Sequence, residues 1–335
     1  METSRRLVLK TLNFDKPQRI PRHLWLLPWA EINYPNELSA IQKKFQDDII
    51  ISPTCLKNQP QKFGDPYKKG VYIDEWGCEF INHQDGVIGE VKKPQINDWQ
   101  NTPNIRLPKE LLTINIQKIN AFCADTDKFV LSGSTVRPFE RIQFIRGTEN
   151  TMMDLALEES KFIELLKEIH NFYLEELQLW CHTNVDGICF MDDWGSQRAL
   201  LISPAMWRKI FKPLYKDYIE LGHKFGKTVF MHSDGFILDI IPDLIELGLD
   251  AINSQIFCMG IKSLKKFKGK ITFWGEIDRQ YLLSNGTTQQ IRDAVKMVHD
   301  SLYQNGGIIA QLEFGAGAKA ENVFTAFETW ETLSK

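Results

Sequence analysis

The chain has 335 residues, of which 43% are hydrophobic and 25% are charged. This composition is typical of a globular protein with a sizeable core, and it excludes a disordered or fibrous chain. Lysine and arginine together number 40 and acidic residues 43, so the net charge of −3 lacks the basic surplus with which proteins bind nucleic acid or anionic membranes.

The sequence does not predict export or membrane insertion. No apolar run reaches the roughly 18 residues that a spanning helix needs, and the N-terminal segment lacks the apolar core of a secretory signal. The 6 cysteines are scattered, without a CxxC pair, which is typical of reduced thiols rather than of a disulfide framework. We therefore expect a cytoplasmic protein.

The first half of the chain contains three predicted strands, at residues 20–26, 48–52 and 129–135. Residues 53–128 interrupt this pattern. Within them, residues 71–92 have the composition and the Asp-Gly turn signal of antiparallel hairpins. We expect residues 53–128 to form an insertion after the second strand.

In the second half, strands alternate with helices. Ser203 and Pro204 are a typical N-cap and first-turn pair, and Pro213 is expected to interrupt the helix that they open. Residues 236–248 are predicted to form another helix, which Gly248 closes. The alternation indicates right-handed βαβ units and a parallel sheet. The five predicted strands are residues 186–193, 228–235, 250–255, 271–278 and 307–315.

Eight strands in total favour an α/β fold of the (β/α)8 TIM-barrel type over an open doubly wound sheet. No GxGxxG motif follows the first strand, which also argues against a dinucleotide-binding sheet. We expect a single TIM-barrel domain over residues 1–335, with the hairpin-containing insertion near the barrel mouth.

Active sites of TIM barrels lie at the carboxyl ends of the strands, and there the sequence places a candidate metal site. His232 and Asp234 are two residues apart, so both side chains can face the mouth. Glu313, on the last strand, could supply a third ligand. The alternative is structural: Asp234 would cap a helix, and His232 would be a hydrogen-bonded core histidine.

The other predicted strand ends carry further candidates. Asp192 and Asp193 could act in acid–base catalysis, although adjacent residues of a strand face opposite sides and only one should reach the mouth. Arg137 could hold a substrate carboxylate or phosphate, or form a structural ion pair. Candidates for substrate binding at the remaining strand ends are Trp25, Trp194, Gln255, Trp274 and Glu276.

Several blocks, among them YIDEWGCEF, DGICFMDDWGSQRALL, GKTVFMHSDG and ITFWGEID, occur in a characteristic order and spacing. With them the chain resembles the uroporphyrinogen decarboxylase superfamily, and most closely its methyltransferase-like branch, which includes methylcobalamin:coenzyme M methyltransferases. The true decarboxylases carry an arginine-rich N-terminal motif that grips the substrate, whereas here the corresponding residues 24–30 are apolar. The resemblance therefore implies a TIM barrel but not tetrapyrrole decarboxylation.

In that branch, a His-x-Cys motif and a cysteine on the last strand bind Zn²⁺, which holds the acceptor thiol as a thiolate. Here His232 is retained, Asp234 stands at the first cysteine position, and the last strand reads Gln311-Leu312-Glu313. Carboxylates in place of thiolates bind zinc less tightly and admit harder cations. By resemblance, Asp192, Asp193 and Trp194 belong to a block that shapes the substrate pocket.

Three hypotheses follow. The first is methyl transfer between a corrinoid, such as methylcobalamin or a corrinoid protein, and a small-molecule thiol or methylated substrate. His232, Asp234 and Glu313 would hold zinc or another divalent metal, or act directly in acid–base catalysis, and Asp193 would help to position the substrate. The second is a decarboxylase or lyase acting on a small carboxylate held by Arg137. The third is a barrel that binds a ligand without catalysis. The resemblance is also compatible with a homodimer.

Overall fold

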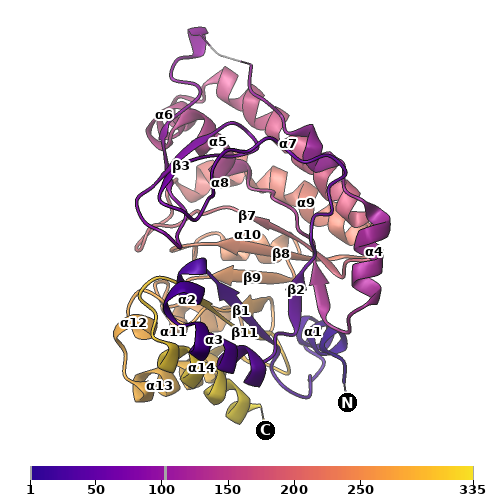
Figure 1. Cartoon of the computed structure of the whole chain (residues 1–335), viewed down its shortest axis with the longest axis vertical. Coiled ribbons are helices and arrows are strands. Elements are labelled where there is room, and N and C mark those ends of the chain that lie inside the picture. Colours follow the sequence, from indigo (N-terminus) through magenta and orange to yellow (C-terminus); the bar gives the residue numbers. More distant parts are fainter. Residues whose placement is uncertain (1, 102–103, 335) are drawn as a thin grey trace.

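The computed structural model describes residues 2–101 and 104–334. Eight parallel strands form one sheet in the order β1-β11-β10-β9-β8-β7-β6-β2, which curls into a nearly closed barrel with helices around it (Figure 1). The prediction of a TIM barrel with eight strands is confirmed. Residues 102–103 of the predicted insertion, and residues 1 and 335, lie outside the described residues.

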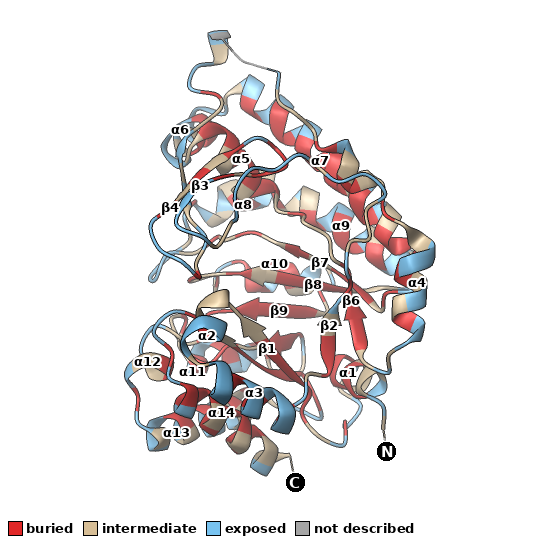
Figure 2. Ribbon diagram, in the orientation of Figure 1, coloured by how far each residue is buried: buried red, intermediate tan, exposed pale blue. Residues whose placement is uncertain are grey.

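Each barrel strand falls within a segment that the sequence predicted. Their side chains are mostly buried, because one side faces the barrel interior and the other the helices (Figure 2). The strands are β1 (Arg22–Leu26), β2 (Ile49–Ile51), β6 (Phe129–Leu131), β7 (Gly187–Met191), β8 (Thr228–Ser233), β9 (Ala251–Ser254), β10 (Thr272–Trp274) and β11 (Ile308–Phe314).

The helices bury one face against the sheet and expose the other (Figure 2). In the described part of the chain, none has both the length and the apolar character to cross a membrane. The α-helices are α1 (Ser4–Leu12), α2 (Pro28–Asn33), α3 (Pro35–Lys44), α4 (Ile116–Ala124), α5 (Pro138–Arg146), α6 (Thr148–Leu157), α7 (Ser160–Cys181), α8 (Pro204–Ile210), α9 (Lys212–Lys224), α10 (Ile241–Glu246), α11 (Ile261–Leu264), α12 (Leu282–Asn285), α13 (Thr288–Leu302) and α14 (Ala320–Leu333).

Prolines set several of the helix boundaries. Ser203 caps α8 by accepting a hydrogen bond from the backbone N–H of Met206, as predicted. Pro213 lies in the first turn of α9, so the predicted interruption falls at Phe211, between α8 and α9. The helix predicted over residues 236–248 is shorter than expected. It begins only at Ile241, because Pro242 favours the first turn of a helix over its interior.

The insertion between β2 and β6 contains the predicted hairpins. Strands β3 (Gly70–Ile73), β4 (Glu79–Asn82) and β5 (Glu90–Lys93) form a separate antiparallel sheet. Gly86 accepts a hydrogen bond from the backbone N–H of Trp29 in α2, at 3.3 Å, and Asp74 pairs with Arg141 of α5 at 2.5 Å. Because α2 and α5 follow β1 and β6, these contacts hold the insertion at the carboxyl-end side of the barrel.

Asp48 closes the barrel where β1 and β2 meet. Its backbone N–H donates to the carbonyl oxygen of Arg22, and its carboxylate accepts the backbone N–H of Arg22 at 2.8 Å. The same carboxylate, 1% exposed, takes both terminal nitrogens of Arg19 at 2.6 Å. One residue thus joins the two strands that stand at opposite ends of the sheet order.

We expect Asp48→Asn to lower the free energy of unfolding by about 3 kcal/mol, because the substitution leaves a partly buried guanidinium without its counter-charge. Urea unfolding followed by circular dichroism measures this change. The control is Asp300→Asn on the exposed face of α13, where we expect a change below about 0.5 kcal/mol. Equal effects of the two substitutions would contradict the role of Asp48 in closure.

Candidate active site

The loops that follow β7 and β8 are joined backbone to backbone at the barrel mouth. The N–H of Asp192 donates to the carbonyl oxygen of His232 at 3.0 Å, and the N–H of Gly195 donates to that of Asp234 at 3.1 Å. The N–H of Phe236 then donates to Ser196 at 2.8 Å. These hydrogen bonds hold residues 192–195 (DDWG) and residues 232–235 (HSDG) side by side.

This contact requires glycine at positions 195 and 235. A Cβ at Gly195 would lie 2.2 Å from the backbone nitrogen of Phe236. A Cβ at Gly235, where φ is +78°, would lie 2.0 Å from the carbonyl oxygen of Gly195. Any larger residue would push the two loops apart and carry the neighbouring carboxylates with them.

His232 is held with a defined tautomer. The side-chain nitrogen of Asn253 donates to the carbonyl oxygen of Trp274, so the side-chain oxygen of Asn253 faces the ring. This oxygen lies 2.6 Å from Nδ1 of His232, and it can only accept, so Nδ1 carries the proton. The Nε2 lone pair of the neutral ring is therefore free to bind a metal or to take a proton.

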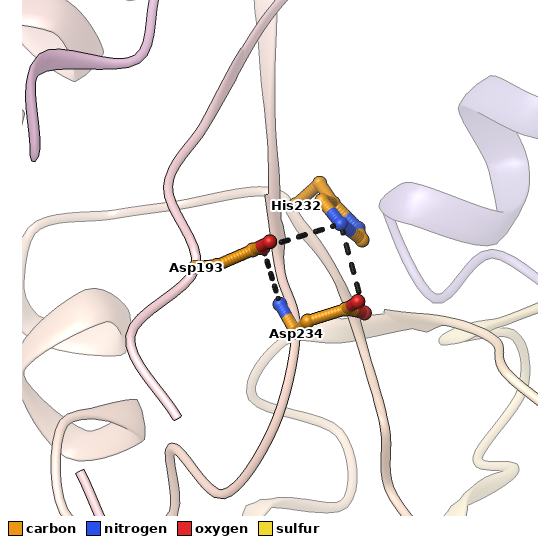
Figure 3. A group of neighbouring side chains, drawn as sticks. All are labelled: Asp193, His232 and Asp234. Atoms are coloured by element: carbon orange, nitrogen blue, oxygen red, sulfur yellow. Dashed lines mark hydrogen bonds and ion pairs between the residues drawn. The ribbon is translucent and has the colours of Figure 1, made fainter. Parts of the chain in front are cut away.

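Two carboxylates face that nitrogen (Figure 3). Asp193 Oδ1 lies 3.6 Å from His232 Nε2, and Asp234 Oδ1 lies 3.7 Å from it. Asp193 Oδ1 also accepts the backbone N–H of Asp234 at 2.9 Å. Within residues 2–101 and 104–334, Asp234 Oδ1 is buried and has no hydrogen-bond partner. The three side chains each offer a ligand atom, and these atoms lie within 4.8 Å of one another.

Arg279 holds the second carboxylate oxygen of Asp234. The same guanidinium pairs with Glu313 at 2.8 Å and lies 3.4 Å from Glu276. Glu313, predicted as the third metal ligand, therefore forms an ion pair with Arg279 instead. The side chain that joins His232 and Asp234 in the group of possible ligands is Asp193. Sequence reasoning missed Arg279, whose only signal was its place directly after the predicted strand 271–278.

Two predicted functional residues serve the core rather than the mouth. Asp192 is fully buried and accepts hydrogen bonds from the backbone N–H groups of Phe139 and Glu140, at 3.1 and 2.8 Å. It therefore binds the N-terminal end of α5, and burial raises its pKa well above the ordinary value. The ring of Trp194 is also fully buried, stacked 3.9 Å from that of Phe139. A catalytic role for Asp192 and a substrate contact for Trp194 both conflict with this burial.

Of the remaining predicted substrate-binding residues, Trp25 lies beside His232. Trp25 is half-buried, and its ring lies 5.0 Å from that of His232. Trp274 is buried in the barrel interior and donates to His23, so the predicted substrate contact is replaced by a packing role. Arg137 precedes α5 and approaches Glu140 only to 3.9 Å, which leaves its guanidinium able to bind a further anion.

Gln255 and Glu276 line a cavity of about 160 Å³ beside this group. Glu276 is 2% exposed, and burial raises the pKa of its carboxyl to about 8, with Arg279 opposing the shift. All of the lining residues follow β7, β9 or β10 and so belong to the barrel mouth. The others are Gln197, Phe257, Cys258, Asp278, Arg279 and Gln280.

A model of the uroporphyrinogen decarboxylase (URO-D) family matches residues 71–332. The chain belongs to this family. A methyltransferase from Methanosarcina mazei shares the fold, with a TM-score of 0.69 and 14% identity over 100% of both chains. A B12-independent methionine synthase from Shewanella sp. W3-18-1 is less similar, with a TM-score of 0.46 and 12% identity over 70% of this chain and 68% of the other. No curated protein matches the chain.

The family assignment made from the sequence blocks is thus confirmed. In this member of the uroporphyrinogen decarboxylase family, the barrel mouth holds an imidazole between two carboxylates, and a guanidinium binds one of these carboxylates. The group can coordinate a cation or transfer protons.

We expect Gly235→Ala to destabilise the protein by more than about 3 kcal/mol, because a methyl group there meets the backbone of the neighbouring loop. Gly226→Ala is the matched control, since Gly226 also has a positive φ, +68°, but a Cβ added there would meet nothing within 4 Å. Gly226→Ala should lower the free energy of unfolding only by the backbone strain, about 1–2 kcal/mol. Similar thermal unfolding of the two variants would contradict the close approach of the loops.

The tautomer of His232 can be read directly by ¹⁵N NMR. We expect a protonated Nδ1 and an unprotonated Nε2 in the neutral ring, and loss of this preference in Asn253→Ala. The half-buried His299, which lies far from Asn253 in sequence and bonds Asp300 instead, should give unchanged signals. A proton on Nε2 in the neutral ring of the unmodified protein would show that Asn253 does not determine the tautomer of His232.

Proposed function

We propose that the protein is a methyltransferase-like enzyme that moves a methyl group between a corrinoid and a small-molecule thiol or methylated substrate. Asp193, His232 and Asp234 would hold a divalent cation, such as zinc, at the centre of the site. Membership of an enzyme family supports catalysis in general. The observation that carries the proposal is the convergence of three ligand atoms with the Nε2 lone pair of His232 directed at them.

The residues fit a catalytic metal ion. Imidazole and carboxylate are ordinary ligands of catalytic zinc, which takes three protein ligands and leaves one position for substrate. Asp234 Oδ1 is buried without a hydrogen-bond partner in the described part of the chain, and a cation would satisfy it. When bound, such a cation would lower the pKa of a thiol acceptor and so favour the nucleophilic thiolate near neutral pH.

The surrounding residues orient these ligands. Asn253 keeps Nδ1 of His232 protonated and leaves Nε2 as the donor. Arg279 binds one oxygen of Asp234 and thereby directs the other toward the imidazole. The backbone N–H of Asp234 donates to Asp193 Oδ1 and holds that oxygen near the imidazole. Such partners of metal ligands typically set both the geometry and the basicity of a site.

One observation favours a second function, in which the protein is a decarboxylase or another lyase that acts on a small carboxylate. Among the described residues, the ion pair of Arg137 is a loose one with Glu140, and Arg137, Asp193 and His232 all influence the pKa of Glu140 electrostatically. A substrate carboxylate on Arg137 would therefore lie near the imidazole, which could deliver a proton. This function predicts release of carbon dioxide without a corrinoid.

We expect near-stoichiometric zinc in protein prepared without an affinity tag or chelator, or after zinc is added to that protein. His232→Ala and Asp193→Asn should each lower the affinity for zinc at least tenfold. Elemental analysis and competition with a chromophoric chelator measure this. His299→Ala is the control, because that ring lies on α13 and bonds Asp300. The rate of methyl transfer from methylcobalamin to a panel of thiols should decrease in the variants that lose the metal. Absence of metal in every variant, after zinc addition, would exclude the zinc-thiolate mechanism.

A further inference from the structure

The cavity beside the candidate metal group is lined by two carboxyl groups and one guanidinium. Glu276 and Asp278 reach it from the loop after β10, and Phe257 reaches it from the loop after β9. Asp278 makes no ion pair within residues 2–101 and 104–334, although its Oδ1 accepts two backbone N–H groups. Oε1 of Glu276, 2% exposed, has no hydrogen-bond partner among the described residues. A buried carboxyl and an unpaired carboxylate thus line the same small space.

The only guanidinium at this cavity is already engaged, as far as the described residues go. Arg279 contacts Glu276, Glu313 and Asp234, one with each of its three nitrogens. Four carboxyl groups, including Asp278, therefore lie around one cation. The excess negative charge disfavours an anionic ligand, because that ligand would have to displace a carboxylate from Arg279.

We propose that this cavity binds a small organic cation, an ammonium or sulfonium compound, with Glu276 and Asp278 facing its charge and Phe257 lying against it. Carboxylates and an aromatic ring are the groups with which proteins recognise such cations. A volume of about 160 Å³ is below the ~300 Å³ at which drug-sized sites begin, so the ligand has only a few heavy atoms.

This inference rests on the proposed function, for which it names the class of the methylated substrate. Such a cation would give its methyl group to a thiolate or a reduced corrinoid. The bond from the methyl carbon to nitrogen or sulfur breaks, its electron pair stays on that atom, and the acceptor's lone pair forms the new bond. The leaving amine or sulfide departs neutral, and an acidic cavity that favours the cation releases it more readily.

Calorimetry with choline and with its neutral isostere 3,3-dimethylbutan-1-ol tests the proposal, in the presence of a chelator. We expect choline to bind at least tenfold more tightly than the isostere. Glu276→Gln and Asp278→Asn should each weaken choline binding at least fivefold without altering that of the isostere. Asp300→Asn, on α13, is the control and should match the unmodified protein. Equal binding of the two probes, or preferential binding of propionate, would overturn the inference.

The outcomes separate the two proposals. Choline binding without metal binding or methyl transfer would support the cation site and reject the proposed function. Methyl transfer from a corrinoid to thiols, in a protein that shows no preference for choline, would support the proposed function and reject the cation site.

Discussion

Two like charges held beside one imidazole are the constraint on which the barrel mouth depends. Asp193 and Asp234 both approach Nε2 of His232 within 3.7 Å, and their mutual repulsion must be offset. Arg279 supplies a positive charge to one carboxylate, and the backbone N–H of Asp234 supplies a hydrogen bond to the other. Neither contact gives Asp234 Oδ1 a hydrogen-bond partner among the described residues.

The fold supports this arrangement through backbone contacts rather than through long side chains. The loops after β7 and β8 touch at Gly195 and Gly235, so Asp193 and Asp234 are fixed by main-chain geometry. Asn253, on the neighbouring strand β9, sets the imidazole from the barrel interior. Sites built on strand ends in this way position their ligands more precisely than sites on free loops.

Strand periodicity and family blocks predicted the barrel, the hairpin insertion and the placing of His232, Asp193 and Asp234 at the mouth. They could not decide which of two adjacent aspartates faces inward. Alternation shows only that the two side chains point apart. The hydrogen bonds from the N-terminal end of α5 hold Asp192 in the core, which leaves Asp193 at the mouth. The role of Arg279 was equally unpredictable, because a residue in a loop is placed by tertiary contacts that leave no periodic signal. Glu313, which the sequence suggested as a third ligand, pairs with the same Arg279 and lies outside the group of three side chains.

We propose that Asp193, His232 and Asp234, and not Glu313, hold a cation. An anomalous difference map from a crystal of the zinc-loaded protein, collected across the zinc absorption edge, tests it most directly. We expect one peak at about 2.0–2.2 Å from Nε2 of His232 and from an oxygen of each aspartate, with Arg279 still paired to Glu313. A peak bound to Glu313, or no peak between the three side chains, would show that they do not form the cation site.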